Sequence, residues 1–226
     1  MSQSTAFLKL IESRHSIRAF LPEAVPRQTI EQILATAARA PSGTNTQPWH
    51  VHVMTGTRRD QLVRAVCDAY DHTAADHEYE YDYYPTEFFE PYLSRRRTVG
   101  FALYGLLGIA KGDRAAMQAQ HRRNYEFFGA PVGLMFSIDR RLGKGSWLDY
   151  GGFLQNVMLA ARACGYDTCP QAAWVQFHRV VSTQLALPNN EQLVCGMALG
   201  RADPAAPANR LVSERVTLAE FVQFHE

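Results

Sequence analysis

Residues 148–164 constrain the fold more than any other part of this sequence. The segment is almost wholly apolar, and its apolar side chains include Phe153, Leu154, Val157, Met158, Leu159 and Ala161. Gly165 follows it as a natural C-terminal stop for a helix. Because a helix that is apolar all round must be covered on every side, the sequence predicts a helix over residues 148–164 at the centre of the molecule.

Three other segments have the composition of strands, and several have that of helices. Residues 50–55 alternate in polarity, while residues 132–139 and 193–200 are the continuous apolar runs of buried strands. Apolar residues at helical spacing predict helices that end near Ser13, before Pro41 and near Tyr70, and helices over residues 99–108 and 113–127. A capping-box pattern at Thr217–Glu220 predicts a last helix. Helices outnumber strands and separate them, so the predicted class is α+β with a small central sheet, in one domain of residues 1–226.

Residues 71–100 differ from the rest of the chain. They contain seven Tyr or Phe between Tyr79 and Tyr92, several acids, two prolines and the run Arg95-Arg96-Arg97. No regular amphipathic element fits this pattern. Two interpretations stay open: an excursion that packs on the surface by its rings, or a lid over a ligand pocket.

The charge balance excludes several function classes. The chain has 23 Lys and Arg against 22 Asp and Glu, so it has no global field that would attract nucleic acid or an anionic membrane. No apolar run approaches the roughly 20 residues of a membrane span. The first residues carry charges where a signal peptide would be apolar, and we therefore expect a cytoplasmic protein.

Familiar catalytic and metal-binding motifs are missing from the sequence. It contains no G-x-S-x-G, G-x-G-x-x-G, P-loop or H-E-x-x-H motif. The four cysteines form no C-x-x-C pair, and His50 and His52 share one face of a predicted strand without a third ligand nearby. We therefore expect no metal site and no disulfide.

Two polar segments suit ligand binding. Arg14-His15-Ser16-Ile17-Arg18 places two arginines and a hydroxyl within five residues, which suits a phosphate, although a solvated basic turn is the alternative. Residues 41–49, PSGTNTQPW, present amides and hydroxyls that can bind the edge of a polar ring. An ordinary helix-to-strand connection is the alternative for this second segment.

Together and in this order, the two segments resemble the FMN-dependent nitroreductase family, of the oxygen-insensitive type that acts on nitroaromatic acids and related compounds. The resemblance continues through residues 124–131, 147–151, 165–173 and 196–204, and so spans nearly all of the chain. It implies a three-layer α/β/α sandwich with a mostly antiparallel sheet, in an entwined homodimer that holds FMN at its interface.

The resemblance also implies roles for individual residues. Arg14, His15 and Ser16 would face the phosphate and pyrimidine side of the flavin, with Arg18 in the same motif. The residues that would reach the flavin from the partner subunit are Pro41, Ser42, Asn45 and Gln47. Those that would lie along the isoalloxazine are Pro170, Gln171, Ala172 and Ala173. After Gly200, either Arg201 or Arg210 would complete the phosphate site, and the sequence leaves that choice open.

The implied chemistry needs no catalytic side chain, because N5 of the flavin carries the hydride. NADPH or NADH would donate it, and a small nitroaromatic or quinone would accept it in a ping-pong cycle. The rings of Tyr83, Tyr84, Phe88 and Phe89 are candidates for a wall against flat acceptors. The run of residues 95–97 would attract a substrate carboxylate or the 2′-phosphate of NADPH, or is simply solvated. Two alternatives remain: a dehydrogenase or dehalogenase of the same fold, and a flavin-binding sensor without catalysis.

Overall fold

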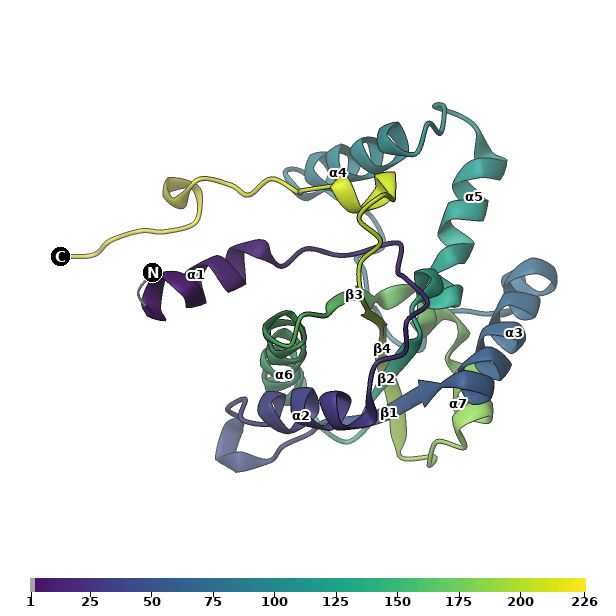
Figure 1. The fold of residues 1–226 in the computed structure, drawn as a ribbon, viewed down its shortest axis with the longest axis horizontal. Coiled ribbons are helices and arrows are strands. Elements are labelled where there is room, and N and C mark those ends of the chain that lie inside the picture. The colour runs from purple at the N-terminus through teal and green to yellow at the C-terminus, as the bar shows by residue number, and fades with distance from the viewer. Residues whose placement is uncertain (1–2) are drawn as a thin grey trace.

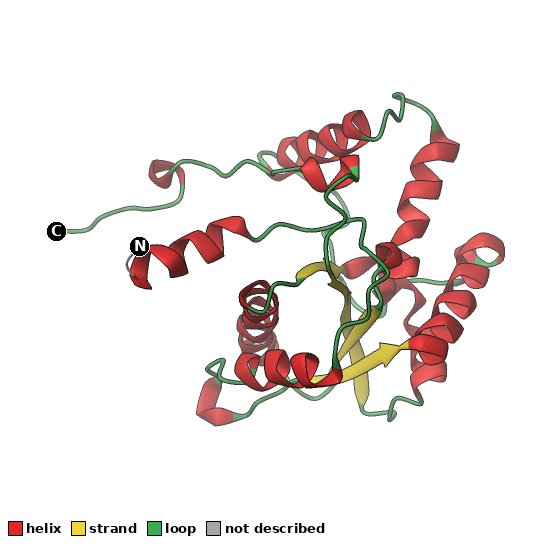
Figure 2. Ribbon diagram, in the orientation of Figure 1, coloured by secondary structure: helices red, strands yellow, loops and turns green. Residues whose placement is uncertain are grey.

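The computed structural model describes residues 3–226 and places a four-stranded sheet between two layers of helices (Figures 1 and 2). The strands are β1 (His50–Thr55), β2 (Val132–Asp139), β3 (Asp167–Gln171) and β4 (Glu191–Gly200). Their order across the sheet is β1-β2-β4-β3, and each neighbouring pair is antiparallel. The prediction of an α+β fold with a small, mostly antiparallel central sheet is confirmed.

Each face of the sheet has its own hydrophobic core. Helices α2 (Arg27–Ala37) and α6 (Lys144–Ala163) cover one face, while α3 (Gly56–His72) and α7 (His178–Leu185) cover the other (Figure 1). Along β2, Leu134 and Phe136 pack in the first core and Met135 packs in the second. Successive side chains of a strand point to opposite faces, so a strand that is apolar at every position needs a helical layer on both sides.

Two glycines of the sheet allow aromatic rings to lie directly on its backbone. A Cβ atom on Gly133 would lie 2.3 Å from the Phe127 ring, and one on Gly196 would lie 2.5 Å from the Trp174 ring. These two rings stack on each other with their centroids 4.5 Å apart. Side chains at either glycine would displace the second core from the sheet.

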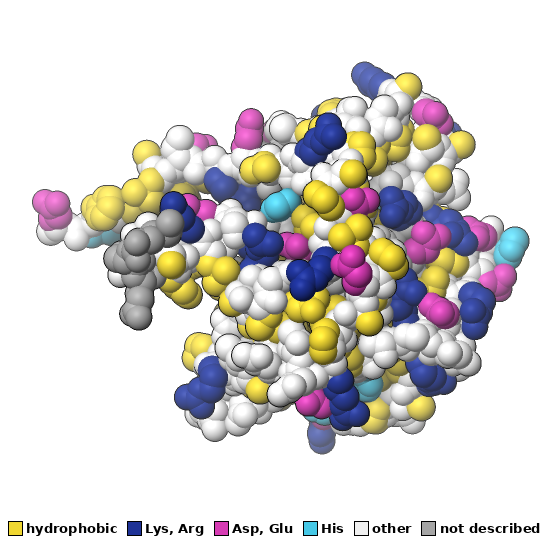
Figure 3. Space-filling view, viewed as in Figure 1, with side chains coloured by type: hydrophobic (Ala, Val, Ile, Leu, Met, Phe, Trp, Pro, Cys, Tyr) yellow, Lys and Arg dark blue, Asp and Glu magenta, His cyan; other side chains and the backbone are white. Residues whose placement is uncertain are grey.

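Several elements project from this three-layer body. Helix α1 (Gln3–Ser13) and the C-terminal arm, which we define as residues 211–226, extend in the same direction in Figure 1. Figure 3 shows hydrophobic side chains along the arm, where Phe224 is 81% exposed. Helices α4 (Tyr92–Leu106) and α5 (Arg114–Arg122) bury no residue. None of the helices within residues 3–226 has both the length and the hydropathy to cross a bilayer.

The predicted central helix exists, but the chain alone does not cover it. Helix α6 begins at Lys144, four residues before the predicted start, and Gly165 follows its end with a φ of +78°, as expected of a glycine that stops a helix. The prediction that it is covered on every side is wrong for a single copy, because Leu148 is 80% exposed. One apolar stripe of α6 packs on the sheet, while Leu148 faces outward.

Other predictions from local pattern were wrong in part. Strand β3 and helix α7 were not predicted, and the helix expected over residues 99–108 begins at Tyr92, inside the aromatic segment. The helix expected over residues 113–127 ends at Arg122 and continues as a 3-10 turn, Arg123–Gly129. The last predicted helix is only the 3-10 turn Leu218–Glu220, although its capping box is present. Helix α4 has no apolar stripe and β3 contains a proline, so neither has a strong local signal.

Candidate functional site

The first polar segment lines a cleft at the junction of α1 and the C-terminal arm. The cleft has a volume of about 840 Å³. Its lining includes Arg14, His15, Ser16 and Arg18 from the segment, together with Val99, Gln155, Leu211, Val212, Ser213 and Arg215 from α4, α6 and the arm. Four predicted site residues therefore lie at one surface that three distant parts of the chain complete.

Backbone hydrogen bonds hold this segment across the end of the sheet. The Ile17 N–H donates to the Thr168 carbonyl of β3 at 3.1 Å, and the Leu21 N–H donates to the Arg201 carbonyl at 2.9 Å. Residues 14–18 therefore have a defined position at the edge where β3 begins and β4 ends.

Asn209 ties the same segment to the C-terminal part of the chain. Its side-chain oxygen accepts from the N–H of Arg18 at 2.7 Å, and its amide nitrogen donates to the carbonyls of Ala19 and Asp203, each at 2.8 Å. An asparagine in a turn is ordinary in sequence, so no local signal marks this role.

Arg14 and Arg215 are two of the charged residues that line the cleft. Burial and then the positive charge of Arg215 lower the pKa of Arg14 below its ordinary value. The Arg215 guanidinium donates only to the Ser213 carbonyl and hydroxyl and to the Glu214 carbonyl. Within residues 3–226, neither guanidinium has an acidic partner within 4 Å. The cleft lining thus holds three arginines, Arg14, Arg18 and Arg215, against the one carboxylate of Glu12, and this excess of guanidinium groups suits an anion such as phosphate.

Arg201 and Arg210, of which one was predicted to complete the phosphate site, do not line this cleft. Arg201 donates to the Gly165 carbonyl at 3.4 Å and stacks over the Tyr166 ring, 4.8 Å from its centroid. Arg210 is exposed and does not line the cleft. Sequence reasoning missed Arg215, because nothing in the local pattern of the arm indicates which of its residues returns to α1.

The residues predicted to lie along the isoalloxazine begin within β3, whose last two residues are Pro170 and Gln171. Pro170 is exposed, while Gln171 is buried and donates from Nε2 to the Asn124 carbonyl at 2.6 Å. Ala172 and Ala173 open the 3-10 turn Ala172–Phe177. Gly200 has a packing reason to be glycine, because a Cβ atom there would lie 2.7 Å from Cδ of Pro131.

The second polar segment forms an exposed loop with unusual backbone geometry. Thr44, Asn45 and Gln47 have positive φ angles of 49°, 61° and 47°. The Ser42 hydroxyl accepts from the Gln47 N–H at 3.0 Å. Neither Pro41 nor any later loop residue lines the cleft of its own chain, so one copy does not bring the two predicted halves of the site together.

The aromatic segment of residues 71–100 is fixed to the body at Glu80 and Tyr81. Glu80 forms an ion pair with Arg140 and lies 3.5 Å from Nδ1 of His178. The Tyr81 hydroxyl donates to the Val194 carbonyl at 3.0 Å, and its ring meets the Trp147 ring edge-on at 4.9 Å. These contacts attach residues 80 and 81 of the segment to β4, α6 and α7.

Of the four predicted acceptor residues, Tyr83 lines a cavity to which Tyr84, Phe88 and Phe89 do not contribute. That cavity, of about 670 Å³, lies between residues 81–83, the first half of α6 and β4, and Trp147 and Leu154 also line it. Burial raises the pKa of Tyr83 to about 12. Tyr84 and Phe88 instead receive the Arg96 guanidinium, 5.9 and 4.3 Å from their ring centroids, and Phe89 packs on Tyr92. The sequence left open that the run of residues 95–97 is simply solvated, and the contacts of Arg96 with these two rings show that it is not.

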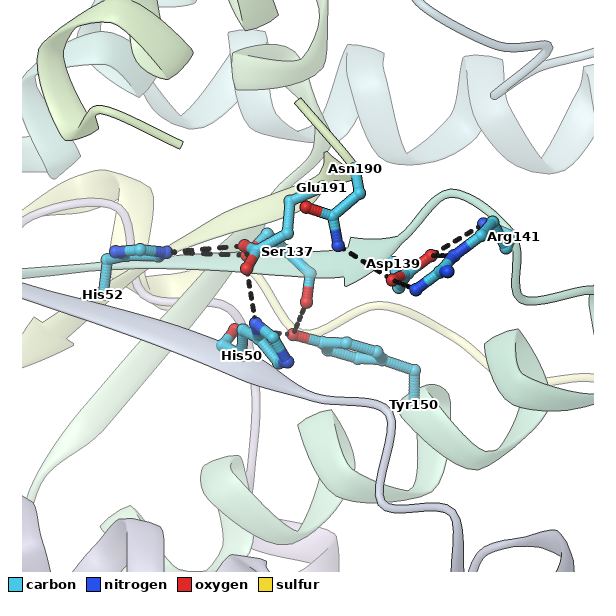
Figure 4. Close-up of polar contacts among 8 residues, drawn as sticks. All are labelled: His50, His52, Ser137, Asp139, Arg141, Tyr150, Asn190 and Glu191. Atoms are coloured by element: carbon cyan, nitrogen blue, oxygen red, sulfur yellow. Dashed lines mark hydrogen bonds and ion pairs between the residues drawn. The ribbon is translucent and has the colours of Figure 1, made fainter. Parts of the chain in front are cut away.

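His50 and His52 belong to a structural network around Glu191 (Figure 4). The buried Glu191 carboxylate accepts from the Ser137 hydroxyl at 2.5 Å and lies 2.6 Å from Nδ1 of His50 and 3.9 Å from Nε2 of His52. Burial would raise the pKa of Glu191, but the hydrogen bonds from Ser137 and His50 bring it below its ordinary value. Burial also lowers the pKa of His52.

This network joins β1, β2 and β4, and Tyr150 of α6 donates from its hydroxyl to the carbonyls of His50 and Ser137. Among residues 3–226, no group of three or more His, Cys, Asp or Glu could hold a metal ion. The two histidines are therefore part of a network of polar contacts that joins the strands of the sheet.

Comparisons with known proteins bear on this geometry. The model of the Nitroreductase family matches residues 11–201. The chloronitrobenzene nitroreductase of Comamonas testosteroni is 41% identical over 218 residues, 96% of each chain, and the 4-nitrobenzoate reductase of Pseudomonas putida is 40% identical over 96% of this chain and 95% of its own. The crystal structure of the FMN and NADPH-dependent nitroreductase NfnB from Sphigopyxis sp. strain HMH has a TM-score of 0.94 at 39% identity, with both chains fully covered.

Proposed function

The chain belongs to the nitroreductase family, and from this premise we propose that it is an FMN-dependent oxidoreductase that uses NADPH to reduce nitroaromatic compounds. The observation that carries the proposal is that Arg14 and Arg215 line one cleft and that, within residues 3–226, neither has an acidic partner within 4 Å. Near-full-length relatives named for nitroaromatic substrates support the choice of acceptor.

The cleft residues fit the charged end of FMN. Arg14 and Arg215 would hold the phosphate, and the Ser16 hydroxyl would donate a further hydrogen bond. The stretch from Pro170 to Ala173 would lie along the ring system, and a backbone N–H of this stretch would donate near N5. When bound, FMN supplies the hydride-transfer chemistry, and the chain binds and orients it.

A second copy of the chain would complete the site. The loop of residues 41–47 does not line its own cleft, and we propose that it reaches the FMN of the partner in a homodimer. Exposed apolar side chains mark the surface that the partner would cover: Phe7, Leu8, Leu148, Val212, Leu218, Phe221 and Phe224. They lie on α1, at Leu148 of α6 and on the C-terminal arm, and together they suit an interface in which the two copies exchange arms.

The visible spectrum of the purified protein, followed by a turnover assay, tests this function. We expect the absorption bands of oxidised flavin, and NADPH oxidation that depends on an added nitroaromatic. A colourless protein that FMN cannot reconstitute would refute the proposal. Bound flavin without turnover would favour a sensor, and turnover only with halogenated or saturated substrates would favour a dehalogenase or dehydrogenase of the same fold.

The cavity lined by Tyr83 is the best candidate for the wall against the acceptor ring. Its lining combines the rings of Tyr81, Tyr83 and Trp147, and the ion pair of Glu80 with Arg140 holds the segment in place. Flat aromatic molecules stack favourably on such rings.

We expect Tyr83→Ala to raise the KM for nitroaromatic acceptors about tenfold, because the loss of one stacking ring costs about 1.4 kcal/mol. The KM for NADPH should change less than twofold. Phe89→Ala is the matched control, because Phe89 is 61% exposed and lines no part of the cavity. Equal effects of the two substitutions in steady-state kinetics would contradict this assignment.

A further inference from the structure

We propose that Asp149 is a positioning residue for the flavin site, whose carboxylate sets the conformation of the loop that reaches the FMN of the other copy. The inference rests on the proposed function and adds a residue to it. It starts from a hydrogen bond between two elements far apart in sequence: Oδ2 of Asp149 accepts from the Gly43 N–H at 3.0 Å.

The loop needs such support because its backbone is strained. Thr44, Asn45 and Gln47 all have φ angles in the left-handed region, where residues with a Cβ are disfavoured. Strained conformations persist only where the surrounding structure holds them, and they gather at ligand-binding sites. The hydrogen bond from the Gln47 N–H to the Ser42 hydroxyl closes the loop on itself but does not attach it to the body.

Asp149 supplies that attachment from a rigid element. It is the sixth residue of α6, and the neighbouring Tyr150 and Phe153 are almost wholly buried in the first core. A Cβ atom on Gly43 would lie 3.8 Å from Oδ2 of Asp149, so the loop backbone rests directly against the carboxylate. The hydrogen bond from Gly43 to Asp149 therefore fixes the position of the loop relative to the first core.

The carboxylate is available for this task because no cation competes for it. Within residues 3–226, Asp149 has no Lys, Arg or His partner within 4 Å. A hydrogen bond from an N–H to an ionised carboxylate is stronger than one between neutral groups. Its loss frees the loop to leave the strained conformation, which would have to be restored each time FMN binds.

The test compares Asp149→Ala with Asp149→Asn. The alanine variant removes the acceptor, and we expect its Kd for FMN to rise about tenfold with an unchanged melting temperature of the apoprotein. The asparagine variant keeps an acceptor oxygen for the Gly43 N–H, so its Kd should stay within about threefold of the unaltered protein. Asp68→Ala is the matched control, because Asp68 is exposed on α3 and contacts only His72.

Mixed dimers show where the residue acts. Consider a dimer of one Arg14→Ala copy and one Asp149→Ala copy. If Asp149 acts on the FMN site of the partner, both substitutions affect the same site, and the other site is intact. At an FMN concentration that leaves both parent homodimers mostly empty, the mixed dimer should hold about one FMN. If it stays as empty as the parents, Asp149 acts on its own copy's site and the inference is wrong.

Two further results separate the inference from the function on which it rests. If the unaltered protein binds no FMN, the proposed function itself fails. If it binds FMN and Asp149→Ala binds FMN equally tightly, or if Asp149→Asn is as impaired as Asp149→Ala, the function stands and the role of this hydrogen bond is overturned.

Discussion

Arg14→Ala and Arg215→Ala should each weaken FMN binding about a hundredfold. Each substitution removes one of the three arginines that line the cleft, Arg14, Arg18 and Arg215, and a charged hydrogen-bonding partner of this kind contributes about 1.5–3 kcal/mol. Because burial and the charge of Arg215 already lower the pKa of Arg14, the two cations repel each other until an anion lies between them.

Fluorescence titration of the apoprotein with FMN measures the effect. Arg201→Ala and Arg210→Ala are matched controls that remove the same charge outside the cleft, and each should change the Kd less than threefold. Arg201 is engaged with Tyr166 and Gly165, and Arg210 is exposed. If Arg210→Ala empties the protein while Arg215→Ala does not, the phosphate site lies where the sequence alone placed it.

Removal of residues 218–226 should convert the proposed homodimer into monomers at micromolar concentration. The segment contains Leu218, Phe221 and Phe224, which are 59%, 67% and 81% exposed in a single chain. Burial of a large apolar side chain stabilises by about 1.5–3 kcal/mol, and a symmetric dimer buries each one twice. Even a net loss of about 4 kcal/mol weakens dimerisation a thousandfold.

Light scattering and sedimentation measure the oligomeric state of the shortened chain. The truncation keeps Arg215, so any loss of FMN reports the loss of the partner and not of the phosphate contact. Removal of only His225 and Glu226 is the control, because it leaves the apolar side chains in place. A shortened protein that remains dimeric would show that the C-terminal arm is not part of the interface.

The strongest local patterns predicted their elements closely. The apolar run of β2 and the alternating β1 have the predicted bounds, and the apolar helix α6 ends one residue before its predicted end. Residues 14–18 and 41–47 were predicted as polar segments with four candidate site residues each. Such features depend on neighbours within a few residues, which the sequence displays directly.

Features that depend on distant partners were not predictable in this way. Strand β3 is five residues long and forms because β4 pairs with it. Tyr83 lines a cavity because Glu80, three residues before it, forms an ion pair with Arg140, sixty residues away in the sequence. Among the three arginines of the last 26 residues, only the fold separates Arg215 from Arg201 and Arg210.

The sequence by itself determined the family of the protein, its layered fold and the two polar segments of its site. The tertiary structure decided which groups meet: it placed Arg215 in the same cleft as Arg14, brought Asp149 to the loop of residues 41–47, and left Leu148 and the apolar side chains of the arm exposed. The physical reason is range. Backbone periodicity and turn chemistry act over a few residues, whereas electrostatic and packing contacts join residues that only the folded chain brings together.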